Sequence, residues 1–166
     1  SPFIVIGTQN PSAAYDGTYA LPTAQLDRFL ARVSIGYPTA EQELALLSDG
    51  MPHVAPVSTP GELRRAQQAV HSVHTSHALV RYVVALLVAT RTHPLVEVGA
   101  SPRAGLLLIA AARAHAVIDG RDFVIPDDVQ ALAHVVLRHR LRLSLSAPID
   151  GAENVVADAL AEVAAQ

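Results

Sequence analysis

Two residue types are missing from this chain of 166 residues, and each absence excludes a class of site. There is no cysteine, so neither a disulfide framework nor a thiolate metal site is possible. There is no lysine either, because all 12 basic side chains are arginine. A phosphate-binding loop of the Walker type needs a lysine on the β- and γ-phosphates, so these residues cannot form one. Catalysis through a lysine base or a lysine Schiff base is excluded for the same reason.

Strong positive charge and long apolar runs are absent as well. The net charge is −3, which gives no electrostatic reason to expect nucleic acid or an anionic membrane as a partner. The longest apolar run in the middle of the chain, Tyr82–Thr90, lies between two arginines and is far too short to span a bilayer. We therefore expect neither nucleic-acid binding nor membrane insertion, and the lack of cysteine fits a cytoplasmic location.

The sequence pattern changes near Pro38, which divides the chain into residues 1–38 and 39–166. In the first part, residues 3–7 form a continuous apolar run, typical of a strand buried on both faces in a parallel sheet. Residues 32–37 alternate as a second strand, and a loop and a short helix over residues 23–30 are expected between the two. In the second part the apolar period is helical almost throughout, which predicts a helical domain.

Capping patterns place the helix starts in the second part. Pro126 is expected to begin one helix, and an apolar stripe over residues 155–163 predicts a final, alanine-rich one. A short extended segment is expected from residue 141. The N-caps of four further helices are expected at Thr39, Thr59, Ser76 and Ser101, the first two within capping boxes.

Three polar residues are candidates for a binding or catalytic site. Asn10 follows the carboxyl end of a predicted buried strand, where open α/β sheets bind ligands, and its amide could hold a water against a phosphate. Arg28 lies beside the predicted buried stripe of its short helix, so it and Asp27 are expected to point outward. Arg103 falls in the first turn of a helix, where the helix dipole disfavours a cation but free N–H groups favour phosphate.

Each candidate also has an ordinary structural interpretation. Asn10 precedes a proline and could simply make a local turn. Arg28 could be a solvated surface arginine, and Arg103 could form a salt bridge with Glu97 on the preceding segment. These alternatives stay open on the residue pattern alone.

Two long stretches resemble one protein family. Residues 3–38, "FIVIGTQNPSAAYDGTYALPTAQLDRFLARVSIGYP", resemble the segment of MoxR-type AAA+ ATPases that runs from the sensor 1 strand through the arginine finger. Residues 99–141, which begin "GASPRAGLLLIAAARAHAVIDGRDFVIPDDV", resemble the sensor 2 part of the helical lid in the same family. The resemblance covers nearly the whole chain, with the motifs in the order that the family requires.

The resemblance implies a role for each candidate. Asn10 matches sensor 1, which orients the attacking water and senses the γ-phosphate. Arg28 matches the arginine finger, which reaches into the nucleotide site of the neighbouring subunit in a ring. Arg103 matches the sensor 2 arginine, which couples the bound nucleotide to the position of the lid.

The resemblance also implies a fold class and a function. The expected fold is mainly α: two strands and one short helix of an α/β AAA+ core over residues 1–38, then an all-α lid bundle over residues 39–166. The family's phosphate loop and Mg-binding acidic motif lie upstream of sensor 1 and are missing here. We therefore expect ATP and Mg to serve the intact protein, and the isolated chain to bind no nucleotide tightly and to be inactive.

The expected partners follow from the family. They are other subunits of a ring, expected to be a hexamer, and von Willebrand factor A domain proteins, because the family is linked to chaperone-like remodelling or maturation of other proteins. Nothing in the residues names the client.

Other classes of function stay open beside this one. The chain could be a non-enzymatic helical interaction module. A metal site at His71, His74 and His77 is disfavoured, because Ser76 caps a new helix and no acidic residue lies within the stretch. The arginines and the histidine of residues 138–142 are interpreted as a solvated helix end.

One expectation concerns the two predicted strands themselves. In the AAA+ sheet that the resemblance implies, they are separated by the strand that leads into the phosphate loop, which this sequence lacks. Each would then leave backbone N–H and C=O groups unpaired along an apolar edge. We therefore predict that residues 1–37 do not adopt the family arrangement unaided.

Overall fold

The computed structural model describes residues 3–9, 22–51 and 53–163, with seven α-helices, one 3₁₀ helix and two short strands in this part of the chain. No helix of the described ranges is both long enough and apolar enough to cross a membrane. In chain order the elements are α1 (Thr23–Leu26), α2 (Ala40–Asp49), α3 (Pro60–Ser72), α4 (His77–Thr92), β1 (Val96–Val98), α5 (Pro102–Ile118), α6 (Pro126–Leu137), the 3₁₀ helix η2 (Arg138–Arg140), β2 (Arg142–Leu143) and α7 (Gly151–Glu162). The mainly α fold expected from the sequence is confirmed.

The helices of the second part begin where the sequence predicts. Thr39 and Thr59 each accept a hydrogen bond from the backbone amide three residues on. The side-chain oxygens of Gln42 and Glu62 in turn accept from the backbone amides of Thr39 and Thr59, so both capping boxes are formed. The hydroxyls of Ser76 and Ser101 accept from the amides of Leu79 and Ala104 and cap α4 and α5. Because these caps involve only neighbouring residues, they can be recognised without knowledge of the tertiary structure.

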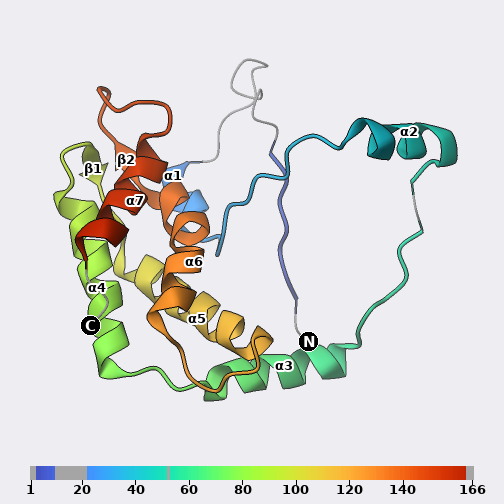
Figure 1. The fold of residues 1–166 in the computed structure, drawn as a ribbon, viewed down its shortest axis with the longest axis horizontal. Helices are drawn as coiled ribbons and strands as arrows, with labels where there is room; N and C mark the ends of the chain where they lie inside the picture. The colour runs from blue at the N-terminus through green and yellow to red at the C-terminus, as the bar shows by residue number, and fades with distance from the viewer. Residues whose placement is uncertain (1–2, 10–21, 52, 164–166) are drawn as a thin grey trace.

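Helices α4, α5, α6 and α7 form a bundle that contains the core (Figure 1). Its centre is made of aliphatic side chains that are almost fully buried, among them Val83, Leu86, Leu108, Val136 and Val155. Strands β1 and β2 pair antiparallel at one end of this bundle. The predicted extended segment after residue 141 is thus β2, whereas its partner β1 was not predicted.

The segments that precede the bundle are extended and exposed. Residues 3–9 and 31–39 belong to no strand, and apolar side chains such as Phe3, Ile4 and Ile35 lie in solvent. Helix α2 buries none of its residues and lies apart from the bundle (Figure 1). The strands predicted over residues 3–7 and 32–37 are not formed, so that prediction is wrong for the described structure, and the expectation about the family arrangement of residues 1–37 stays a prediction.

The loop between β1 and α5 is fixed against the end of α4. The amide of Ala100 donates to the buried Thr90 hydroxyl at 3.1 Å, and the Ala100 carbonyl accepts from Arg91 Nε at 2.8 Å. Gly99 approaches Arg91 very closely. A Cβ atom added to Gly99 would lie 2.7 Å from the Cα of Arg91 and 2.8 Å from the backbone nitrogen of Arg91. The start of α5, with Ser101 and Arg103, therefore depends on a glycine at position 99.

We expect Gly99→Ala to lower the free energy of unfolding by about 1–3 kcal/mol, because backbone atoms of Arg91 must move to admit the methyl group. Gly61→Ala is the matched control. Its added Cβ meets only ordinary contacts at 3.8 Å, with the side chains of Thr59 and Arg65, so no loss is expected. Chemical denaturation of both variants measures the difference, and equal stability of the two would contradict the packing described for Gly99.

Candidate functional site

Arg28 lies in a turn and is exposed to solvent. The helix predicted over residues 23–30 ends at Leu26, and the chain continues through a turn over residues 27–30, called the finger turn below. The α-helical pattern does not continue here, because the amides of Arg28 and Phe29 donate to the carbonyls three residues back, those of Gln25 and Leu26, rather than four residues back. Arg28 itself is thereby placed outside the bundle, as the sequence predicts.

Asp27 does not point outward as predicted. Its side chain is half-buried, and one carboxylate oxygen lies 3.6 Å from Nε of Arg140 and 3.5 Å from the hydroxyl of Ser101. Ser101 is the residue that caps α5. The residue before Arg28 therefore contacts both the 3₁₀ helix η2 and the start of the helix that carries Arg103. Such a contact joins residues far apart in the sequence, so local periodicity could not predict it.

Arg103 is exposed in the first turn of α5 and forms no ion pair with any described residue. The salt bridge to Glu97 that the sequence left open is not formed, because that carboxylate binds Arg142 at 3.0 Å instead. An arginine beside the free N–H groups of a helix start is suited to an anionic ligand. Among the described residues, nothing therefore prevents the Arg103 guanidinium from binding an anionic ligand.

The basic residues of η2 are not a solvated helix end, and the interpretation given above is wrong for two of them. His139 and Arg140 are 6% and 3% exposed. The guanidinium of Arg140 donates to the carbonyl of Phe29, and Nε2 of His139 lies 3.3 Å from the same oxygen. A helical period from Ala133 through Val136 to Arg140 would have placed this arginine on the buried face. That signal was present in the sequence.

Burial lowers the pKa of both His139 and Arg140, but different neighbouring charges act on each of them. Burial lowers the pKa of His139, and the charge of Arg140 lowers it further, so the imidazole is neutral near pH 7. Burial also lowers the pKa of Arg140; Asp27 opposes this shift, while the positive charge of Arg103 adds to it. Arg103 and Arg140 are therefore close enough to repel each other, with the Asp27 carboxylate as the nearby counter-charge.

The segments that carry Arg28 and Arg103 meet at one surface, although neither arginine lines the groove between them. An open groove of about 350 Å³ is lined by Asp27, Ser101 and Arg140, among others, so the turn of Arg28 and the helix start of Arg103 meet at one surface. Asn10 lies outside the described residues, and its predicted role stays a prediction.

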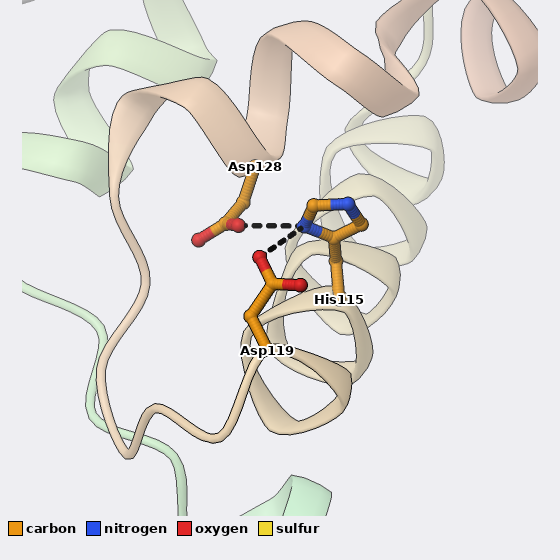
Figure 2. Close-up of side chains that lie close together, drawn as sticks. All are labelled: His115, Asp119 and Asp128. Carbon is orange, nitrogen blue, oxygen red and sulfur yellow. Dashed lines mark hydrogen bonds and ion pairs between the residues drawn. The ribbon is translucent and has the colours of Figure 1, made fainter.

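A second polar cluster lies at the other end of α5. Figure 2 shows His115 of this helix and Asp119, the residue that follows the helix, close to Asp128 in the first turn of α6. The Asp128 carboxylate is buried and accepts from Nδ1 of His115 at 2.7 Å, from the amide of Ile125 at 2.9 Å and from two nitrogens of Arg121 at 2.6 and 2.8 Å. These bonds tie α5 to the start of α6.

The same cluster contains three potential metal ligands, His115, Asp119 and Asp128, whose ligand atoms lie within 4.8 Å of one another. However, one nitrogen of Arg121 lies 3.1 Å from Asp119 and 2.6 Å from Asp128. A guanidinium therefore already serves as the cation between the two carboxylates. The arrangement is that of a partly exposed guanidinium paired with one buried carboxylate, Asp128, whose hydrogen bonds are satisfied.

Comparison with known proteins assigns the class. Residues 88–163 match the AAA lid domain family, and residues 1–31 match the ATPase family associated with various cellular activities (AAA). The chain thus combines part of an AAA ATPase core with its lid. A crystal structure of a "putative ATPase" from Cytophaga hutchinsonii has the same fold, with a TM-score of 0.80 and 28% identity, over 90% of this chain and 50% of that one.

The relatives define the family within this class. Chaperone MoxR1 of Mycobacterium tuberculosis is 43% identical over 90% of this chain and 43% of its own length. Protein MoxR of Paracoccus denitrificans is 35% identical over 78% and 45%. The uncharacterised protein YeaC of Bacillus subtilis is 40% identical over 98% and 52%. The chain belongs to the MoxR family of AAA+ ATPases, and it spans about half the length of these relatives.

The Asp128 cluster predicts how stability depends on pH. Burial alone would raise the pKa of this carboxyl, but the hydrogen bonds from Arg121, Ile125 and His115 outweigh burial and lower the pKa to about 2. A carboxyl whose pKa is lower in the folded state stabilises the fold above its unfolded pKa, and this contribution is lost as pH falls through the folded value. We expect about 2 kcal/mol to be lost between roughly pH 4 and pH 2.

Denaturation of wild type and Asp128→Asn at pH 7 and at acid pH measures this loss. The variant should be less stable at pH 7 and should lose less on acidification across that window. Asp119→Asn is the control, because its half-exposed carboxylate should contribute little. If Asp128→Asn has the stability and acid dependence of wild type, the cluster does not stabilise the fold as described.

Proposed function

We propose that this chain supplies the arginine finger and the lid of a ring-forming AAA+ ATPase that hydrolyses ATP in its intact form. The observation that supports this best is the placement of Arg28. The side chain is exposed, yet the backbone of its turn is held by buried side chains of the lid. A surface arginine without a role needs no such support, whereas a finger that must reach a neighbouring nucleotide does.

The residues present fit one side of a nucleotide site. Arg103, exposed beside the free N–H groups of α5, would contact the phosphates as sensor 2, and Asn10 would hold the attacking water as sensor 1. Arg28 would contact the γ-phosphate bound by the neighbouring subunit. In phosphoryl transfer such a finger supplies on the order of 10³–10⁵ in rate by neutralising charge that develops in the transition state.

The phosphate loop and the Mg²⁺ ligands would come from outside these residues, since a chain without lysine has no Walker loop. The 166 residues alone should therefore neither bind ATP tightly nor hydrolyse it.

The wider role that we propose is chaperone-like remodelling or maturation of partner proteins in the cytoplasm. The support is that one relative bears the name chaperone MoxR1. The assembly would be a ring of six subunits, and proteins with von Willebrand factor A domains are candidate partners.

The test is Arg28→Ala in the intact protein, measured by steady-state ATP hydrolysis and by nucleotide titration. We expect ATP affinity close to wild type and turnover lowered by on the order of 10³ or more, because the finger acts on the neighbour's nucleotide. Arg64→Ala, an exposed arginine on α3, is the control and should retain full turnover. A non-enzymatic interaction module would show no ATP hydrolysis in any variant.

A mixing experiment tests action between subunits. Arg28→Ala subunits keep an intact phosphate loop, so subunits with a disabled phosphate loop can provide them with a finger. Turnover should reappear when the two inactive proteins are mixed. Wild-type turnover of Arg28→Ala alone would show that the finger assignment is wrong.

A further inference from the structure

Side chains of η2 in the lid form hydrogen bonds with the backbone of the finger turn and of the residues that follow it. The Arg140 guanidinium donates to the carbonyl of Phe29 and lies 3.5 Å from that of Leu30. Arg138 donates to the carbonyl of Arg32 at 3.0 Å, and the amide of Arg32 donates to the Val135 carbonyl of α6 at 2.9 Å. Because most of these bonds go to the main chain, they fix the path of the backbone on the C-terminal side of Arg28.

Arg140 is an unusual residue for the place that it occupies. Its side chain is 1% exposed, and its Nε has no hydrogen-bond partner in the described structure, with the Asp27 carboxylate 3.6 Å away. Burying a guanidinium is costly unless its hydrogen bonds are complete, and an apolar residue of similar size would often stabilise such a position equally well. This energetic cost is explained if the hydrogen bonds from Arg140 to the finger turn are needed for function.

The finger turn is also linked to the helix of sensor 2. The Asp27 carboxylate lies between Nε of Arg140 and the hydroxyl of Ser101, which caps α5 two residues before Arg103. A shift of α5 relative to the core on nucleotide binding would therefore displace the residue next to Arg28. A finger moved by about 1 Å can lose on the order of 10² in rate.

We infer that Arg140 is a positioning residue that fixes the finger turn against the lid. The lid of one subunit thereby controls how well Arg28 of that subunit acts on the nucleotide of the neighbour. This inference rests on the proposed role of Arg28 as the arginine finger. The lid would then act on the nucleotide site of the neighbouring subunit as well as on the site of its own subunit.

The test is Arg140→Ala in the intact protein. Turnover should fall by about 100-fold, while ATP affinity stays close to wild type, because the variant's own nucleotide site is unchanged. Arg140→Lys should recover part of the turnover, since an ammonium can still donate to one carbonyl. Arg64→Ala is the control, because this exposed arginine lies on α3 and outside the groove at the finger turn. It should keep wild-type turnover.

Mixing locates the defect. Arg140→Ala subunits mixed with subunits whose phosphate loop is disabled should regain turnover, because the latter supply a sound finger. Arg140→Ala mixed with Arg28→Ala should not, since both lack a working finger. A general disruption of the lid would instead weaken ATP binding and prevent rescue by the first mixture, and either result would overturn the inference.

Two further outcomes are distinguishable. If Arg28→Ala is inactive but Arg140→Ala turns over like wild type, the positioning role falls and the proposed function stands. If Arg28→Ala itself is fully active, the proposed function falls as well.

Should Arg140→Ala fail to fold, Asp27→Asn replaces it, because the amide keeps the shape and removes the counter-charge. Reduced turnover with normal ATP affinity supports the inference, and unchanged turnover overturns it.

Discussion

The arrangement of the candidate site depends on one buried contact, the guanidinium of Arg140 against the carbonyl oxygens at the end of the finger turn. Residues 31–39 are extended and α2 buries nothing, so the chain on the far side of this contact has little other support. Arg28 is held near the lid because its neighbours Asp27 and Phe29 are bound there. Without that contact, the segment that carries Arg28 would join the other exposed parts of the chain.

The helix that presents Arg103 is fixed at both of its ends. At the start, Gly99 and Ala100 are packed and hydrogen bonded against the end of α4. At the other end, His115 holds the buried carboxylate of Asp128 on α6 (Figure 2), and Arg121 donates to the same carboxylate. We expect a helix restrained in this way to move as one body with the bundle. A change at its N-terminus is therefore passed to the finger turn through Ser101 and Asp27 rather than absorbed locally.

Local chemistry explains which features could be predicted from the sequence. The caps at Thr39, Thr59, Ser76 and Ser101 use neighbouring residues only, and the helices begin there as expected. The inward turn of Asp27 and the burial of Arg140 depend on partners more than 70 residues away in sequence. The rule that arginines are solvated failed at residue 140, where the helical period was the better guide. Strand β1 is too short for its pattern to be recognised.

The central claim is that the finger turn is held by the lid of its own subunit while Arg28 acts on the next. The most direct measurement is an experimental structure of the intact assembly with a non-hydrolysable ATP analogue bound. Our account predicts the guanidinium of Arg28 within ion-pair distance of the neighbouring subunit's γ-phosphate, with Arg140 still bonded to the carbonyl of Phe29. Arg28 at the neighbouring phosphate with Arg140 turned away from the finger turn would contradict it.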